Sequence, residues 1–214
     1  MSLKIGITRF LGTNCDEDVR KWTLSKEAKP TYLWFEDRFN IEDYDMIILP
    51  GGFSHGDYLR CGALAARTPV MKSVIDFANK GKPILGICNG FQILCEAGLL
   101  PGALLRNKEQ RFKDQWVNLE VKQNDNPFSK NMTINQKLKL PIAHGEGCYF
   151  ADPDSLKKMN DNEQIWLTYK DNPNGSMMNI AGLTNEKKNI CALMPHPERA
   201  QMEWMGSSDG MFFI

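Results

Sequence analysis

The stretch Pro83-Ile-Leu-Gly-Ile-Cys-Asn-Gly-Phe-Gln-Ile-Leu-Cys-Glu-Ala97 decides how the rest of the chain is interpreted. Its first part, Pro83–Ile87, is short and apolar, as expected of a buried strand. The residues Phe91–Ala97 have a helical pattern that Gly98 ends. Between them stands Gly86-Ile-Cys-Asn-Gly90, the cysteine form of the nucleophile elbow. The sequence therefore predicts a strand, a sharp turn and a helix around one cysteine.

The same alternation of strand and helix precedes this stretch. The predicted strands are Leu3–Thr8, Thr31–Phe35, Tyr44–Leu49, Pro83–Ile87 and, late in the chain, Ile190–Met194. The predicted helices are Gly12 to about Ala28, Pro69–Asn79 with Gly81 as its C′ residue, and Phe91–Ala97. Alternation of this kind predicts a three-layer, doubly wound, flavodoxin-like α/β fold with a mostly parallel sheet.

From about Arg106 to Lys139 the pattern changes to short, alternating, turn-rich pieces. We interpret Gln115–Val121, Asn124–Pro127 and Met132–Ile134 as antiparallel strands added to the main sheet. The basic stretch Arg106–Lys113 is interpreted as a solvated face, with a partner contact as the alternative. The chain has no internal repeat and no low-complexity linker, so residues 1–214 are predicted to form one domain.

Composition excludes several classes of protein. Lysine plus arginine number 26 and aspartate plus glutamate also number 26, so no net charge favours nucleic acid or an anionic membrane as a partner. Charge interrupts the N-terminal apolar run too early for a signal peptide, and no apolar stretch approaches the length of a membrane span. The six cysteines include no C-x-x-C pair, which argues against a zinc site and a secreted disulfide framework. We expect a cytoplasmic protein with a small substrate.

Cys88 is the candidate nucleophile. The turn places its sulfur at a helix N-terminus, where the helix dipole and free backbone N–H groups stabilise negative charge. The same turn presents the N–H of Asn89 as an oxyanion donor. A second donor is expected from Pro50-Gly-Gly-Phe53, because its glycines let the N–H of Gly52 turn toward a ligand. The alternative for each segment is an ordinary tight turn.

A thiol nucleophile needs a base, and the base needs a group that orients it. His196 follows a predicted core strand, and Glu198 is two residues on, so both side chains are expected on one side of an extended segment. His144 and Glu146 have the same spacing in a glycine-rich segment, and spacing alone favours His196 without excluding them. His55 is interpreted as a loop histidine. Neither a P-loop nor a dinucleotide-binding motif is present, so only acyl transfer is predicted.

These residues resemble the class I glutamine amidotransferases over essentially the whole chain. The motifs that carry the resemblance, in the family's order, are Pro50-Gly-Gly-Phe53, Leu85-Gly-Ile-Cys-Asn-Gly-Phe-Gln92, Pro141-Ile-Ala-His-Gly-Glu-Gly147 and Pro195-His-Pro-Glu-Arg199. His55 stands where an aromatic hydroxyl is usual, and Cys148 stands where a basic residue often follows.

The resemblance implies that Cys88 attacks the side-chain amide of L-glutamine, with His196 as acid and base and Glu198 orienting His196. The residues that it assigns to oxyanion and substrate binding are Gly52, Asn89, Gln92, His144 and Gly145. It also implies that the ammonia passes to a large, ATP-dependent synthetase subunit, and that a third small subunit completes the complex. ATP and Mg²⁺ would belong to the synthetase, with no cofactor and no metal in this chain.

Two other functions remain open on the sequence. The first is a cysteine peptidase or other hydrolase built on the same elbow, which peptide cleavage would distinguish from ammonia release. The second is a non-catalytic regulatory module that keeps the fold without turnover. The presence of a nucleophile, a base and an orienting acid in one chain disfavours the second.

Overall fold

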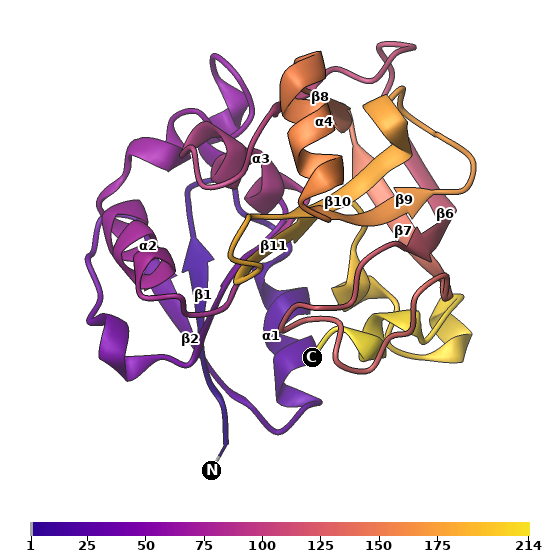
Figure 1. The fold of residues 1–214 in the computed structure, drawn as a ribbon. Coiled ribbons are helices and arrows are strands. Elements are labelled where there is room, and N and C mark those ends of the chain that lie inside the picture. The colour runs from indigo at the N-terminus through magenta and orange to yellow at the C-terminus, as the bar shows by residue number, and fades with distance from the viewer. Residues whose placement is uncertain (1) are drawn as a thin grey trace.

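The computed structural model describes residues 2–214, and one mixed sheet runs through them (Figure 1). Within this range the sheet has nine strands in the order β2-β1-β3-β4-β11-β10-β9-β6-β7. The parallel strands are β1 (Lys4–Arg9), β2 (Lys29–Trp34), β3 (Met46–Leu49), β4 (Ile84–Ile87) and β11 (Ile190–Leu193). The antiparallel strands are β10 (Ile180–Thr184), β9 (Ile165–Tyr169), β6 (Lys113–Val121) and β7 (Lys137–His144). A separate pair joins β5 (Ala103–Leu105) to β8 (Cys148–Phe150).

Helices flank the parallel strands. The α-helices are α1 (Asp16–Leu24), α2 (Pro69–Asn79), α3 (Asn89–Glu96) and α4 (Pro153–Asp161). The short 3₁₀ turns are η1 (Ile41–Asp43), η2 (Ser54–Asp57), η3 (Ala65–Arg67), η4 (Met177–Asn179), η5 (Pro197–Arg199), η6 (Glu203–Met205) and η7 (Asp209–Phe212). Figure 1 shows α1 and α2 on opposite sides of the parallel strands. Right-handed crossovers explain this, because β1 to β2 and β3 to β4 run in opposite directions across the sheet. The doubly wound prediction is confirmed.

The centre of the sheet brings two chain segments to one edge. Every residue of β3 and β4 is buried, as expected of strands covered on both faces. Strand β4 pairs in parallel with β11, with Ile87 opposite Leu193, and the N–H of Cys88 donates to the carbonyl of Leu193 at 2.8 Å. The residues that follow these two strands therefore emerge side by side.

The first helix is shorter than predicted. It ends at Leu24, whereas the sequence pattern predicted an end near Ala28. The N–H of Lys26 bonds to the carbonyl of Thr23 in a tight turn, and Glu27 adopts a left-handed φ of 57°. This turn is needed because β2 begins at Lys29, where it pairs with the first residue of β1.

Two of the predicted antiparallel strands are wrong. Asn124–Pro127 and Met132–Ile134 form the irregular connection between β6 and β7. The side chain of Asn126 explains this, because its Oδ1 accepts from the N–H of Phe128 at 2.9 Å and its Nδ2 donates to Gln123 Oε1 at 2.6 Å. Such local bonds favour a turn over a strand. Strand β6 pairs with β9 on one side and with β7 on the other, and the sequence pattern predicted neither of these two partners.

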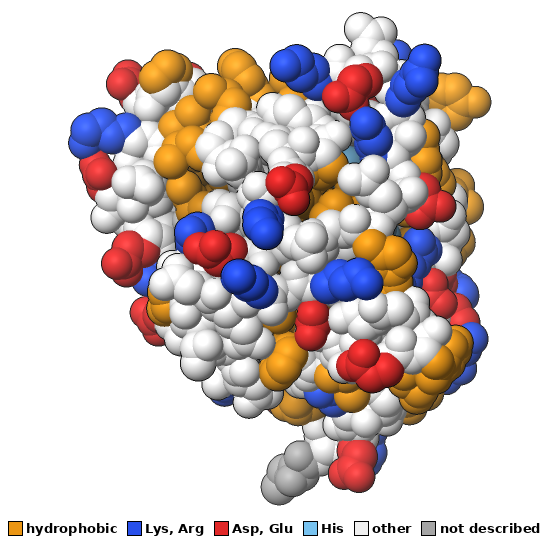
Figure 2. Space-filling model, turned by 90° about the vertical axis from the view of Figure 1, so that its right-hand side faces the viewer, with side chains coloured by type: hydrophobic (Ala, Val, Ile, Leu, Met, Phe, Trp, Pro, Cys, Tyr) orange, Lys and Arg blue, Asp and Glu red, His pale blue; other side chains and the backbone are white. Residues whose placement is uncertain are grey.

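The surface carries charge of both signs. Figure 2 shows lysine and arginine side chains interspersed with aspartate and glutamate on the face that it presents. No helix between residues 2 and 214 has the length and apolar character that a bilayer span requires.

Candidate active site

Cys88 sits at a sharp turn between β4 and α3. Its backbone has φ 52° and ψ −106°, a conformation that L-residues rarely adopt. The two glycines of the motif make this turn possible. A Cβ on Gly86 would lie 2.9 Å from the carbonyl carbon of Gly90, and a Cβ on Gly90 would lie 2.0 Å from the carbonyl oxygen of Leu49. Strand and helix thus approach so closely that only glycine fits at both positions.

His196 and Glu198 form a buried pair beside this turn. His196 Nδ1 lies 2.6 Å from Glu198 Oε1, and the two side chains are 1% and 0% exposed. The expected extended segment is wrong in its second half, because Glu198 belongs to the 3₁₀ turn η5 and reaches the imidazole from there. Burial lowers the pKa of His196, but the charges of Glu198 and Cys88 outweigh burial and raise it well above its usual value. The pair therefore favours the imidazolium.

The free nitrogen of His196 lies in the space that it shares with Cys88. His196 Nε2 has no hydrogen-bond partner among residues 2–214, His196 and Cys88 line one cavity, and Cys88 and Cys15 both lie close enough to raise the pKa of the ring. Gly51, in the loop after β3, packs against His196 and Cys88. A Cβ on Gly51 would lie 2.8 Å from His196 Cε1 and 3.4 Å from Cys88 Cβ. A cavity of about 160 Å³ opens here, with Gly52, Cys88 and His196 among its lining residues.

Two backbone N–H groups next to Cys88 are free. Neither Gly52 nor Asn89 donates its N–H to an acceptor in the described part of the chain. Gly52 has φ +149°, and a Cβ there would lie 2.8 Å from Thr13 Cα. The Asn89 side chain ties the two loops together, since its Oδ1 accepts from the N–H of Ser54 at 3.3 Å. Free donors fixed in this way can stabilise an oxyanion.

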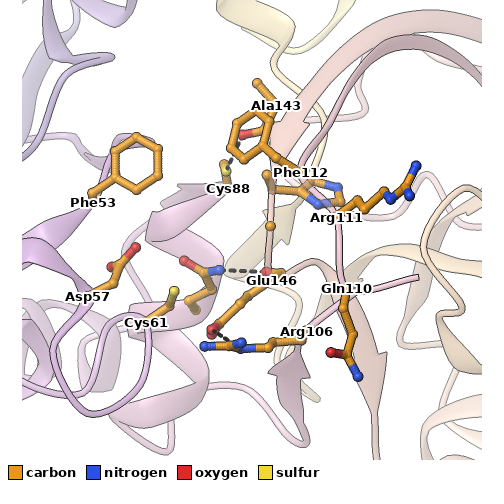
Figure 3. Close-up of a pocket in the computed structure, with 14 residues that line it drawn as sticks. Phe53, Asp57, Cys61, Cys88, Arg106, Gln110, Arg111, Phe112, Ala143 and Glu146 are labelled. Atoms are coloured by element: carbon orange, nitrogen blue, oxygen red, sulfur yellow. Dashed lines mark hydrogen bonds and ion pairs between the residues drawn. The ribbon is translucent and has the colours of Figure 1, made fainter. Parts of the chain in front are cut away.

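A larger cavity of about 320 Å³ adjoins the cysteine (Figure 3). The predicted site residues that line it are Gly52, Cys88, Gln92, His144 and Gly145. Gln92 Nε2 donates to the carbonyl of Glu146 at 2.6 Å, and Cys88 Sγ donates to the carbonyl of Ala143 at 3.8 Å. Asn89 and Glu198 line neither cavity, because Asn89 holds the loops from inside and Glu198 lies behind His196.

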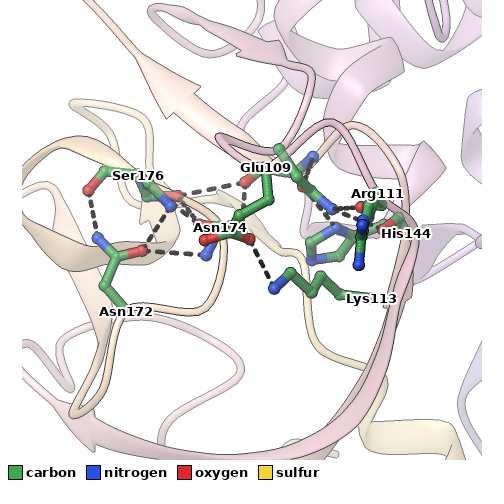
Figure 4. Close-up of polar contacts among 10 residues, drawn as sticks. Glu109, Arg111, Lys113, His144, Asn172, Asn174 and Ser176 are labelled. Carbon is green, nitrogen blue, oxygen red and sulfur yellow. Dashed lines mark hydrogen bonds and ion pairs between the residues drawn. The ribbon is translucent and has the colours of Figure 1, made fainter.

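His144 ends β7 in a very different environment from that of His196. Its Nδ1 lies 3.1 Å from Asn107 Oδ1, which also accepts the N–H of Gly147 at 3.0 Å. Figure 4 shows the His144 imidazole beside Arg111. Because Asn107 Nδ2 donates to the carbonyls of Arg111 and His144, its Oδ1 is the acceptor and His144 Nδ1 carries the proton. Burial, with a smaller contribution from His196, lowers the pKa of His144 to about 4. His144 is therefore neutral near pH 7.

Two residues near the site were missed from the sequence. Asn107 is 0% exposed, although it lies within the stretch Arg106–Lys113 that was interpreted as a solvated face. Its neighbours in the chain are charged, so the pattern gave no indication of burial. Cys15 is the second, and its sulfur accepts from Arg199 Nη2 at 3.0 Å. Its position after the first predicted strand, at the same sheet edge as Cys88, was the available indication.

Cys15, His196 and Glu198 also place one possible metal-ligand atom each within 4.8 Å of one another. Two contacts disfavour a metal ion at this point. Glu198 Oε1 is already bonded to His196. The positively charged Arg199 guanidinium donates a hydrogen bond to the Cys15 sulfur, where a cation would have to bind. The cluster fits an acid–base pair with a supporting thiol better than a cation site.

Comparison with known proteins identifies the family. The model of the CobB/CobQ-like glutamine amidotransferase domain matches residues 2–210. The chain belongs to this glutamine amidotransferase family. A structure of a glutamine amidotransferase from Thermotoga maritima, 19% identical with a TM-score of 0.60 over 94% of this chain and 78% of that one, shares the amidotransferase fold.

Relatives with higher sequence identity have a more specific name than the family. Phosphoribosylformylglycinamidine synthase subunit PurQ of Prochlorococcus marinus is 52% identical over 100% of this chain and 96% of its own length. The protein of the same name from Helicobacter hepaticus is 50% identical over 97% and 94%. A chain in the structure of PurLQS from T. maritima is 43% identical, with a TM-score of 0.91 over 99% of this chain and 95% of that one.

Proposed function

We propose that this chain is the glutaminase subunit of phosphoribosylformylglycinamidine synthase, and that it releases ammonia from L-glutamine through a thioester on Cys88. The observation that carries the reaction is the buried pair of His196 and Glu198, 2.6 Å apart, whose other imidazole nitrogen has no partner in the described chain and whose histidine lines one cavity with the elbow cysteine. The full-length similarity to proteins named PurQ supports the assignment to purine biosynthesis.

The first half of the reaction forms the thioester. The Cys88 sulfur attacks the side-chain carbonyl carbon of glutamine, and the N–H groups of Gly52 and Asn89 stabilise the oxyanion. His196 Nε2 then protonates the departing nitrogen, so ammonia leaves and a γ-glutamyl thioester remains. The raised pKa of His196 suits this step, because the imidazole already holds the proton it must give.

The second half regenerates the thiolate. His196, now neutral, takes a proton from water, and the resulting hydroxide attacks the thioester carbon. The oxyanion forms again at Gly52 and Asn89, and glutamate leaves when the carbon–sulfur bond breaks. Glu198 keeps the imidazole in one tautomer throughout, because its Oε1 accepts a hydrogen bond from Nδ1–H and the proton stays on the ring. Gln92 and the loop at His144 and Gly145 line the space for the substrate.

The ammonia is consumed by another chain. A large synthetase subunit would use it with ATP and Mg²⁺, and a third small subunit would complete the complex, in line with a similar chain occurring in a structure named PurLQS. Residues 1–214 would act as one cytoplasmic amidotransferase domain. Coupled use predicts low glutaminase activity for the isolated chain, because free release would waste glutamine.

Substitution of Cys88 tests the function directly. Cys88→Ala is expected to abolish glutamine-dependent ADP formation by the assembled complex on formylglycinamide ribonucleotide, while activity with added ammonium chloride persists. Cys95→Ala is the matched control, because Cys95 lies in helix α3, which begins directly after Cys88, but lines neither cavity. Retention of full glutaminase activity in Cys88→Ala would reject the assignment. Peptide cleavage in place of ammonia release would favour a peptidase.

A further inference from the structure

The end of the larger cavity away from Cys88 carries two carboxylates. Asp57 and Glu146 both line this cavity, and Cys61 lies between them (Figure 3). Asp57 comes from the turn η2, and Glu146 follows β7, so two segments far apart in the chain contribute one carboxylate each. Figure 3 shows the Cys88 sulfur at one end of the lining residues and the Glu146 carboxylate with Arg106 at the other.

The charges at this end are incompletely balanced. Glu146 Oε1 lies 3.5 Å from Arg106 Nε, whose side chain is 77% exposed. Asp57 has no lysine or arginine partner in the described chain, and its Oδ1 is buried without a hydrogen bond. Burial raises the pKa of Asp57, a hydrogen bond from the Cys61 thiol lowers it by less, and the Glu146 carboxylate raises it. Burial and the two carboxylates also raise the pKa of the Cys61 thiol, so Cys61 stays neutral.

A buried carboxylate oxygen without a donor is costly unless a ligand supplies one. The other polar atom left without a partner on this cavity points to the same kind of ligand. His144 is 3% exposed and lines the cavity, and its Nε2 is an unpartnered acceptor because Nδ1 carries the proton. The cavity therefore presents unsatisfied acceptors and calls for a ligand rich in N–H donors.

The backbone of η2 is built around this placement of Asp57. His55, Gly56 and Asp57 have φ of 53°, 70° and 54°, so three successive residues are left-handed. This conformation strains the backbone of non-glycine residues. Such strained residues cluster at functional sites, where the surrounding structure holds a side chain in place. The turn places Asp57 on the cavity wall while its neighbour Tyr58 stays 75% exposed.

We propose that the Asp57 carboxylate, assisted by Glu146, binds the α-ammonium group of L-glutamine, and that Arg106 at the same end receives the α-carboxylate. This inference rests on the proposed glutaminase function and names how the site selects its substrate. An α-amino acid carries adjacent positive and negative charges, and the cavity offers the complementary pair at the end opposite the nucleophile. The side-chain amide then extends toward Cys88.

The test compares glutamine with 4-carbamoylbutanoate, which has the same amide and chain but lacks the α-ammonium. Ammonia release is measured for both in the complete complex with the synthetase subunit. The wild type is expected to prefer glutamine strongly in kcat/KM. Asp57→Asn, which keeps the shape and removes the charge, is expected to raise KM for glutamine about 10- to 100-fold, because hydrogen bonds to charged groups are strong. It should leave KM for the analogue unchanged.

Two controls and a second variant keep the outcomes distinct. Asp76→Asn replaces an exposed aspartate of α2 that pairs with Arg38. It should leave kcat and KM for both substrates unchanged. Activity with added ammonia reports that Asp57→Asn still folds and assembles. Glu146→Gln provides a second variant, with a smaller loss of the same preference.

An unchanged preference for glutamine in Asp57→Asn, or equal use of both substrates by the wild type, would overturn the inference. A wild-type complex that released no ammonia from glutamine would instead reject the proposed function itself.

Discussion

Two histidines in this chain are followed at the same spacing by glutamate, and the structure gives them opposite chemistry. His196 bonds to Glu198, and the pair raises the pKa of the imidazole. His144 bonds to Asn107, its Glu146 turns toward Arg106, and burial lowers its pKa to about 4. Identical spacing therefore produces a charged acid–base pair in one place and a neutral acceptor in the other.

The difference lies in the backbone after each histidine. Pro197 begins a 3₁₀ turn that brings Glu198 back to the ring. Gly147 instead packs against the face of His144, where a Cβ would lie 2.3 Å from Cε1, and the intervening glutamate points away. A carboxylate two residues on can orient a histidine only when the backbone turns it inward.

Removal of each imidazole in turn tests whether the two histidines have different roles. His196→Asn is expected to lower kcat for glutamine hydrolysis about 10⁴-fold or more, because in the proposed reaction His196 both protonates ammonia and activates water. His144→Asn should keep kcat within about tenfold, because it removes only an uncharged acceptor. Ammonia release by the assembled complex measures both. Similar losses in the two variants would mean that His144 shares the acid–base role.

The two glutamates provide the next test. Glu198→Gln is expected to lower kcat about 10²- to 10⁴-fold, since the amide no longer holds the imidazole in the right tautomer and charge state. Glu146→Gln should raise KM and leave kcat nearly constant. Steady-state kinetics with glutamine, and circular dichroism to check the fold, separate these effects. If Glu198→Gln kept wild-type kcat, Glu146 would become the candidate orienting acid.

The third prediction concerns the free energy of unfolding, which should depend on pH through His144. The unfolded chain takes up a proton on His144 near pH 6.5, and the folded chain takes it up only near pH 4. Protonation therefore favours unfolding, so the contribution of His144 is present above pH 6.5 and is lost as the pH falls toward 4. Urea unfolding across this range should show wild type losing about 3 kcal/mol more than His144→Gln. Parallel curves would contradict a neutral, buried His144.

Local patterns were sufficient for much of the fold and for the nucleophile. The apolar run before Pro50 predicted β3, and helical spacing predicted a helix over roughly Pro69 to Asn79, where α2 lies. The glycines around Cys88 predicted the elbow, because their spacing reflects one close contact between a strand and the helix that follows it. Such features depend on neighbours in the sequence.

Other features depend on contacts between distant residues and left little trace in the sequence. Asn107 bonds to residues that follow β7, and Cys15 meets Arg199 from the other end of the chain. The same holds for β7, whose alternating pattern includes lysines and Pro141. Local turn chemistry at Asn126 also overrode the strand pattern before it.

The crowding at Gly86 and Gly90 bears on how sequences of this kind should be interpreted. A methyl group at Gly90 would collide with the Leu49 carbonyl at 2.0 Å whether or not a sulfur stands at position 88. Packing alone thus preserves both glycines, and a descendant that had lost turnover would still carry them. The two glycines therefore indicate the contact between strand and helix, and the side chains at positions 88, 196 and 198 are the ones that bear on the proposed reaction.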